Sequence, residues 1–356
     1  MKVIYSISIV KNEADIIESF VRYNSSYLDS MVIINHDSSD NTSKILKNLQ
    51  KEGYNIKYIK WDKLMHQQGK VLTKFIYKLI DEKAPDIIIP IDADEFLIAD
   101  NEKNDPRQIL EELNLNYVYS AKWKTYLPKK EGKVFDFVPE NMHYIRNPEL
   151  EEHSKLIIPT KLFTKLKLSL RDGSHNCNNL DSSLKKEITS LKFGHYPVRS
   201  KSQLLSNTLI GALNTLCIPN RYKLRSWHRL ELLEKIINEE ELDLLKIANE
   251  YSSKVAKDTI PNLNYSPMNL KHYKNIEIKY KELSKIDVDK NLIIYSKKLA
   301  EGFCDIKEEN IALNKNNNKQ KKIIEKQKKI IAELYPTKKW LKYKAKNIIS
   351  RIKKIL

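Results

Sequence analysis

The chain has 356 residues and a formal net charge of +17. This length predicts two or three structural units, because domains cluster near about 100–200 residues. Hydrophobic residues make up 41% of the chain, which is enough for a core, whereas 7 glycines and 12 prolines exclude collagen-like and linker-like chains. The sequence has no apolar run of about 18 residues, so no membrane-spanning helix is expected.

The positive charge is concentrated at the C-terminal end. Residues 314–356 carry fifteen Lys and Arg against Glu325 and Glu333, a net charge of +13, which leaves +4 for residues 1–313. A protein that binds nucleic acid needs basic groups on the folded surface that meets the phosphates, so we expect no nucleic-acid partner. The three cysteines have no metal-type spacing, which favours a reducing cytoplasm.

The first hundred residues alternate between strand and helix patterns. Strands are expected at residues 3–10, 31–34, 54–61 and 86–91, and helices at residues 13–23, 43–51 and 71–80. This alternation predicts an α/β fold with a mostly parallel sheet, whose ligands bind beyond the carboxyl ends of the strands. The polar clusters KNE, NHDSSD and DADEF each follow one of these strands. All three are therefore expected to belong to one site.

The remainder of the chain has weaker patterns. Residues 116–193 are β-rich and irregular, residues 201–216 have a helical pattern, and residues 230–251 have the pattern of one continuous helix. Residues 252–313 show helical patches whose packing the sequence does not indicate. We predict a domain at residues 1–230, a helical accessory region at 231–313 and a basic amphipathic tail at 314–356.

DADEF is the segment that most clearly carries chemistry. Asp92, Asp94 and Glu95 directly follow a buried strand, where three carboxylates repel one another unless a cation compensates them. Side chains alternate along a strand, so an Asp-x-Asp motif directs two carboxylates the same way. Such oxygen ligands favour Mg²⁺ or Mn²⁺ completed by diphosphate oxygens and water. For a bare Asp-x-Asp motif, the alternative is a solvated acidic turn with no ligand.

The order and spacing of five segments resemble the family 2 glycosyltransferases, in the bacterial branch with a KNE-A start and a D-x-D-E-F core. The segments are SIVKNEADIIES, VIINHDSSDNTSKIL, IIIPIDADEFL, GSHN and HYPVRSKSQ, and the match covers about residues 1–230. The resemblance implies a GT-A fold, Rossmann-like with a mostly parallel sheet and flanking helices, here followed by a C-terminal helical region and a basic tail.

The resemblance also implies an activity. It is a metal-dependent, inverting, hexosyltransferase-type reaction that moves a sugar from a nucleotide-sugar to a cell-envelope glycan or a lipid-linked acceptor. Mn²⁺ or Mg²⁺ is the implied cofactor, and a UDP-sugar is the first choice of donor. Two alternatives stay open: a nucleotidyltransferase, or a non-catalytic glycan- or nucleotide-binding protein on the same fold. The first is disfavoured because the loop VKNEAD lacks the glycines of a typical nucleotide loop.

Metal and acceptor roles follow from the resemblance. Asp92 is expected to touch the ribose or the metal, and Asp94 to bind the metal that bridges the donor diphosphate and stabilises its departing charge. His195 is expected to complete the metal shell. His175 is its alternative, or contacts the acceptor or a phosphate, and His228 is expected to line the acceptor side. Taken alone, any one histidine is more often structural.

Donor-binding roles follow in the same way. The loop with Val10, Asn12 and Glu13 is expected to hold the nucleotide base. Lys70 is either a donor contact or a surface lysine. Arg199 either reaches the diphosphate, for which a bidentate guanidinium is suited, or forms a surface ion pair.

One departure from the family concerns the residues after the second strand. Family members commonly carry aspartates there, whereas this chain has Asn35 and His36. Asn35 still offers a donor and an acceptor to a base edge, so nucleotide binding is retained in this interpretation and the nucleotide's identity is left open.

An inverting displacement needs a general base near the acceptor hydroxyl. Asp172 and Glu95 are the candidates, and Glu95 alternatively only braces the metal loop. The sequence does not distinguish between them.

Residues 338–356 combine an apolar stripe with a dense set of Lys and Arg. The stripe begins at Trp340 and continues through Leu341, Ala345, Ile348, Ile352 and Ile355. This is the composition of an interfacial helix on anionic lipid, which predicts a cytoplasmic protein held on the inner face of the plasma membrane. A disordered lysine-rich end and a helix packed on a partner chain are the alternatives. Residues 316–334 show two heptads, too few for a coiled-coil assignment, and a homodimer stays open.

Overall fold

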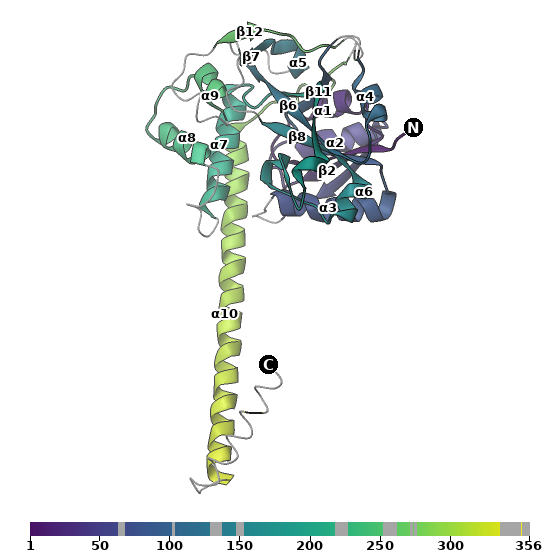
Figure 1. The fold of residues 1–356 in the computed structure, drawn as a ribbon. Coiled ribbons are helices and arrows are strands. Elements are labelled where there is room, and N and C mark those ends of the chain that lie inside the picture. Colours follow the sequence, from purple (N-terminus) through teal and green to yellow (C-terminus); the bar gives the residue numbers. More distant parts are fainter. Residues whose placement is uncertain are drawn as a thin grey trace. The chain divides into compact units, whose positions relative to one another are not determined.

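The computed structural model describes residues 1–62, 68–101, 104–128, 137–146, 153–217, 227–251, 262–270, 273, 276–334 and 350. The chain forms two compact units, Met1–Ser296 and Lys297–Leu356 (Figure 1). The three-part division expected from the sequence stays a prediction.

The first unit is built on a parallel half-sheet in the order β4-β1-β2-β3. Its strands are β1 (Ile4–Val10), β2 (Ser30–Asn35), β3 (Ile56–Lys60) and β4 (Ile87–Pro90), and its connecting helices are α1 (Ile17–Asn24), α2 (Thr42–Lys51) and α3 (Gln68–Lys83). Gly53, directly after α2, has a φ of 96°, the left-handed conformation that commonly ends a helix. The predicted alternation of strand and helix is confirmed.

The β-rich stretch that follows completes a mixed sheet. The full order is β12-β7-β6-β8-β4-β1-β2-β3, with β11 paired to β6 and β5 paired to β11. The added strands are β5 (Glu95–Ala99), β6 (Val118–Leu127), β7 (Tyr144–Arg146), β8 (Ser154–Pro159), β11 (Lys185–His195) and β12 (Leu263–Tyr265). Strand β8 runs antiparallel to both β4 and β6, so the parallel half ends at β4. A separate hairpin pairs β9 (Ser169–Leu170) with β10 (Cys177–Asn178).

Short helices occupy the connections of this half. They are α4 (Pro106–Glu112), α5 (Val138–Asn141), α6 (Thr160–Lys165) and the 3₁₀ turns η1 (Asp172–Ser174) and η2 (Ser182–Leu184).

Two hydrophobic clusters cover the two faces of the parallel half-sheet. One includes Phe20 of α1, Leu49 of α2 and Ile33 of β2, and the other includes Ile76 of α3 and Ile34 of β2. Successive residues of β2 thus enter opposite clusters, as the alternation of side chains along a strand requires. The α/β class predicted from the sequence is confirmed.

The helices after residue 200 agree in part with the sequence. Helix α7 spans Lys201–Leu216, the range predicted. The single helix expected at residues 230–251 is wrong, because the structure has α8 (Trp227–Ile237) and α9 (Leu244–Glu250) instead. Glu239 has a φ of 56°, which ends the first helix, and Asp243 caps the second by accepting from the Lys246 amide at 3.0 Å.

Helix α10 (Val288–Leu334) is 47 residues long and forms the long helix in Figure 1. The sequence indicated only patches of helix before residue 314. The proposed interfacial helix at residues 338–356 lies outside the described residues except for Ser350. Among the helices of the described ranges, none is both long and apolar enough to cross a membrane.

Candidate active site

The segment DADEF forms a tight turn between β4 and β5. The Glu95 amide donates to the Asp92 carbonyl at 3.0 Å, and the Asp92 amide donates to Glu95 Oε2 at 2.9 Å. This reciprocal pair fixes the turn. Asp92 and Asp94 therefore lie beyond the carboxyl end of β4, at the edge of the parallel half-sheet where ligands bind in open α/β sheets.

A lysine from β8 lies among these carboxylates. Lys155 Nζ pairs with Asp92 Oδ2 and lies 3.3 Å from Glu95 Oε1, and the side chains of Lys155 and Glu95 are both 0% exposed. Burial opposes the charged ammonium, but Asp92 and Glu95 outweigh it and raise the pKa of Lys155. The acidic segment thus contains its own cation, which the sequence analysis missed.

Glu95 is held from three directions. Besides Lys155 and the Asp92 amide, its Oε1 accepts from Trp123 Nε1 at 2.7 Å. Burial raises the pKa of Glu95 to about 8, and a carboxyl group with no solvent exposure and three partners braces the turn. The geometry therefore favours the bracing role of Glu95 over the role of general base.

Asp94 and His195 face each other across the strand pair β5–β11. His195 lies opposite Glu95 in the strand register, and the next amide, of Tyr196, donates to the Asp94 carbonyl at 2.9 Å. His195 Nε2 lies 3.6 Å from Asp94 Oδ2. The imidazole stacks on Trp123 at 4.0 Å between ring centroids, and its Nδ1 is buried with no hydrogen-bond partner among the described residues.

The electrostatics of this pair suit a cation. Burial, aided by the charge of Lys155, lowers the pKa of His195 well below 6.5, so the imidazole is neutral at pH 7. Burial and the neighbouring charge of Asp92 raise the pKa of Asp94 to about 6, so this carboxylate is mainly ionised at pH 7. A neutral imidazole and a carboxylate are both ligands of divalent metals.

The protein side chains of the described residues do not provide a complete ligand set for the implied Mn²⁺ or Mg²⁺. Within the described ranges, no three His, Cys, Asp or Glu side chains come close enough to hold an ion together. Asp94 and His195 lie close together, with 3.6 Å between Oδ2 and Nε2. Asp92 instead accepts from Gln68 Nε2 at 3.0 Å and pairs with Lys155. The donor set fits Mn²⁺ or Mg²⁺ if diphosphate oxygens and water supply the remaining ligands.

These pKa values predict how activity depends on pH. Acidification through pH 6 protonates Asp94 while His195 stays neutral, and a protonated carboxyl is a poor cation ligand. We expect kcat/KM, which reports ionisations of the free enzyme, to fall about tenfold per pH unit below about pH 6, where one deprotonated group is required. A pH–rate profile at a fixed Mn²⁺ concentration well below saturation, where protons and metal compete for Asp94, measures this. A flat profile between pH 5 and 7 would contradict the role of Asp94.

A turn from the middle of the chain is joined to the acidic segment through Gln68. The Gly173 amide donates to Gln68 Oε1 at 3.2 Å, and the Gly69 amide donates to Asp172 Oδ1 at 2.8 Å. Gly69 packs so closely that a Cβ would lie 2.3 Å from the Leu170 carbonyl oxygen. Asp172 is exposed, and it lies next to Gln68, whose side chain donates to Asp92. One accessible candidate for the general base is therefore close to the acidic segment.

His175 follows this turn and packs on the same tryptophan as His195. Its Nδ1 lies 2.7 Å from the Ser154 carbonyl oxygen, and its ring lies 5.1 Å from Trp123 between centroids. Burial and the charge of Lys155 lower the pKa of His175 to about 4, so this imidazole is also neutral. Trp123 therefore packs against two of the predicted site histidines, His175 and His195. The sequence analysis did not predict this contact.

Arg199 anchors the loop after β1. Its Nε donates to Asp15 Oδ2 at 2.6 Å, and its Nη2 donates to Asp15 Oδ1 at 2.9 Å and to Glu13 Oε2 at 2.8 Å. The Arg199 side chain is 3% exposed and that of Asp15 is 0% exposed. Arg199 thus forms an ion pair, but the pair is buried and not on the surface. The pair uses the guanidinium donors that were the alternative candidates for binding a diphosphate.

The two loops expected to bind the nucleotide contact each other. Asn12, with a φ of 57°, accepts at Oδ1 from the Ser39 amide at 2.7 Å. Its Nδ2 is buried without a partner among the described residues. Asn35 pairs with Val10 in the strand register, and its amide group bonds Ser38 and Ser43. The Asn35 side chain therefore shapes the loop, whereas Asn12 retains a donor for a ligand.

Two predicted residues add little to this site. Lys70 is exposed on the first turn of α3, close in sequence to Gln68. His228 belongs to α8, but its side chain lies outside the described part of the chain.

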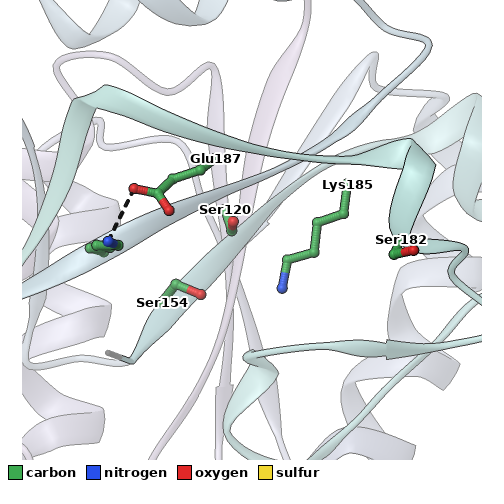
Figure 2. Close-up of a pocket in the computed structure, with 6 residues that line it drawn as sticks. Ser120, Ser154, Ser182, Lys185 and Glu187 are labelled. Atoms are coloured by element: carbon green, nitrogen blue, oxygen red, sulfur yellow. Dashed lines mark ion pairs between the residues drawn. The ribbon is translucent and has the colours of Figure 1, made fainter. Parts of the chain in front are cut away.

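A polar pocket of about 320 Å³ lies on a different face of the sheet (Figure 2). Its lining includes Ser154 and Lys122, which are paired in the strand register, and Lys122 forms an ion pair with Glu187 at 3.3 Å. Strand alternation directs Ser154 and Lys122 away from the face that carries Lys155 and Trp123. We therefore do not assign this pocket to the acidic site.

Neither a family model nor a curated protein matches the sequence. Among solved structures, TarS from S. aureus is similar at 13% identity over 66% of this chain and 71% of that chain, with a TM-score of 0.36. Glucosyl-3-phosphoglycerate synthase from Mycobacterium tuberculosis, solved with Mn²⁺ and UDP, is similar at 14% identity over 62% and 81%, with a TM-score of 0.32. A mannosyltransferase from Pyrobaculum calidifontis, solved with GDP-Man and Mn²⁺, is similar at 13% identity over 62% and 67%, with a TM-score of 0.38.

These similarities are too weak to assign residues. The observed strand order, the helices on both faces and the acidic turn after β4 stand independently of them. These features show an α/β architecture with a mixed sheet and flanking helices.

Proposed function

We propose that the chain is a metal-dependent, inverting glycosyltransferase that uses a nucleotide-sugar, with a UDP-sugar as the first donor to test. The observation that carries the proposal is the pairing of Asp94 with a neutral, buried His195 beyond the carboxyl end of β4. The two loops expected to bind the nucleotide support it. They are residues 10–13, after β1, and residues 35–43, after β2, and both lie at the same edge of the sheet.

In this proposal Asp94 and His195 hold Mn²⁺ or Mg²⁺, which when bound stabilises the charge that develops on the leaving nucleoside diphosphate. Asp92, fixed by Lys155 and Gln68, contacts the ribose or completes the metal shell. Asn12 offers its buried Nδ2 donor to an acceptor atom of the nucleotide. These residues bind and orient the donor.

The acceptor hydroxyl must lose its proton as its oxygen displaces the diphosphate at the anomeric carbon. Asp172 is the better candidate for this base, because it is exposed whereas Glu95 is fully buried. His175 and His228 remain the proposed acceptor- or phosphate-side residues. The acceptor class that we propose is a cell-envelope glycan or a lipid-linked sugar.

Thermal unfolding with a panel of nucleoside diphosphates and nucleotide-sugars tests donor binding. A ligand that binds only the folded state stabilises it by mass action, by about 2.7 kcal/mol at a ligand concentration of 100 times the Kd. The melting temperature rises as a consequence. We expect one nucleotide class to stabilise the protein in Mn²⁺ and to lose that effect in EDTA. No stabilisation by any nucleotide, with or without metal, would sink the proposal.

We further propose that the basic tail holds the enzyme on anionic membranes, where a lipid-linked acceptor resides. The support is the net charge of +13 in residues 314–356 together with Trp340 and an isoleucine stripe. In flotation assays with anionic liposomes, we expect the full chain to rise with the lipid and a chain truncated after Leu313 to stay in the dense fraction. Equal flotation of both would refute this role.

A further inference from the structure

The acidic turn contains an unusual balance of charge. Three carboxyl groups gather there, from Asp92, Asp94 and Glu95, and the ammonium of Lys155 pairs with Asp92 and lies 3.3 Å from Glu95. The turn therefore already holds one buried positive charge, and that charge repels any divalent cation that approaches the same carboxyl groups.

No second cation of the described chain is available for this turn. Arg199 is near enough to lower the pKa of Asp94, but its guanidinium binds Glu13 and Asp15 directly. Of the groups that act on Asp92 and Glu95, Lys155 is the cation with direct contacts to both. It is also fully buried, so water does not screen its charge strongly.

We infer that Lys155 is the resident counter-ion of the acidic turn, a positioning residue that keeps the turn assembled without metal and limits its affinity for a free divalent cation. The inference rests on the proposed function, because it concerns the same metal site. It predicts that the metal binds firmly only when a donor diphosphate supplies further oxygen ligands.

The physical reason is the cost of buried charge. A buried carboxylate left without its partner is strongly destabilising, so removal of Lys155 leaves Asp92 and Glu95 in need of another cation. A divalent ion then no longer meets the repulsion of the buried ammonium, and its attraction to the turn increases. Loss of the lysine should thus weaken the metal-free protein and strengthen metal binding at once.

The test compares wild-type protein with Lys155→Met, Lys155→Arg and, as a control, Lys122→Met. Lys122 lies on the neighbouring strand β6, forms an ion pair with Glu187 and is one of the residues that line the polar pocket. Melting temperatures are measured for the full chain in EDTA and over a Mn²⁺ titration without nucleotide. We expect Lys155→Met to melt lower in EDTA and to bind Mn²⁺ at least about tenfold more tightly than wild type. Lys155→Arg and Lys122→Met should keep the wild-type Mn²⁺ affinity.

The double variant Lys155→Met/Glu95→Gln covers the case in which the single variant does not fold. It removes the buried ammonium together with the carboxyl group that lies 3.3 Å from it, so Glu95 is not left without its partner. Because the repulsion of Lys155 is gone in this variant too, its Mn²⁺ affinity should exceed that of wild type by at least about threefold. An affinity equal to that of wild type would contradict the charge argument.

The outcomes separate this inference from the proposed function. If Lys155→Met and wild type bind Mn²⁺ equally, while both bind it more tightly with a nucleoside diphosphate, the inference about Lys155 is wrong and the proposed function stands. If neither protein responds to Mn²⁺, with or without nucleotide, both are wrong.

Discussion

Replacement of Asp94 by Asn is expected to lower kcat/KM for sugar transfer by at least about 100-fold. Loss of a residue that only orients a metal ligand typically costs 10–100-fold, and Asp94 is proposed as a direct ligand. Asn keeps the shape of the side chain but not its charge. Steady-state kinetics at several Mn²⁺ concentrations, with the donor found in the nucleotide panel, measure the effect.

The same substitution should not destabilise the fold. Burial and Asp92 raise the pKa of Asp94 from 3.8 to about 6, so the folded protein holds this proton more tightly than the unfolded chain does. Stability is therefore lost as the pH rises from 3.8 to about 6, and the full penalty is present at pH 7.5, where an uncharged Asn removes it. We expect the metal-free melting temperature at pH 7.5 to stay equal or rise.

Asp100→Asn is the matched control. Asp100 lies directly after β5, whereas Asp94 lies directly before it. The Asp100 side chain is 49% exposed and pairs with Lys192, so its loss should change kcat/KM less than about twofold, because such surface pairs contribute about 0–1 kcal/mol. If Asp94→Asn retained wild-type turnover, the role of Asp94 as a metal ligand would be wrong.

Replacement of Arg199 by Met is expected to produce the largest loss of stability, about 3–5 kcal/mol. The guanidinium makes bonds to Asp15, Glu13 and the Tyr196 carbonyl, and Asp15 is fully buried. Its removal leaves a buried carboxylate without a partner. Urea unfolding at pH 7, with the slope compared between variants, measures the change in the free energy of unfolding.

Lys192→Met serves as the control for this variant. Its partner Asp100 and Lys192 itself are 49% and 37% exposed, so water screens the pair and we expect a loss below about 1 kcal/mol. If Arg199→Met also lowered the free energy of unfolding by less than about 1 kcal/mol, Arg199 would not anchor the loop. The alternative role, a contact to the donor diphosphate, would then be favoured.

The sequence predicted the parallel half of the sheet because the signals there are local. Apolar residues recur at helical spacing in α1 and α2, and the apolar run of β4 marks a strand covered on both faces. The break within residues 230–251 was missed, because the segment EEELD at residues 239–243 fits the helical pattern on both sides of it, whereas Asp243 in fact caps a new helix.

The acidic segment of the site was also predictable, but its partners were not. Asp92, Asp94 and Glu95 are adjacent in sequence, whereas Lys155 reaches them only through the pairing of β8 with β4 and β6. Arg199 and Glu13 are 186 positions apart in the chain. The single local hint was a lysine within the otherwise apolar strand SKLIIP of β8.

The central claim is that the pair Asp94–His195 supports metal-dependent sugar transfer, and release of nucleoside diphosphate from a nucleotide-sugar tests it most directly. The measurement compares wild type and Asp94→Asn, each with Mn²⁺ and with EDTA. The account predicts release by wild type in Mn²⁺, and a rate at least about 100-fold lower in EDTA or in the variant. Release that persists unchanged in EDTA and in Asp94→Asn would contradict it.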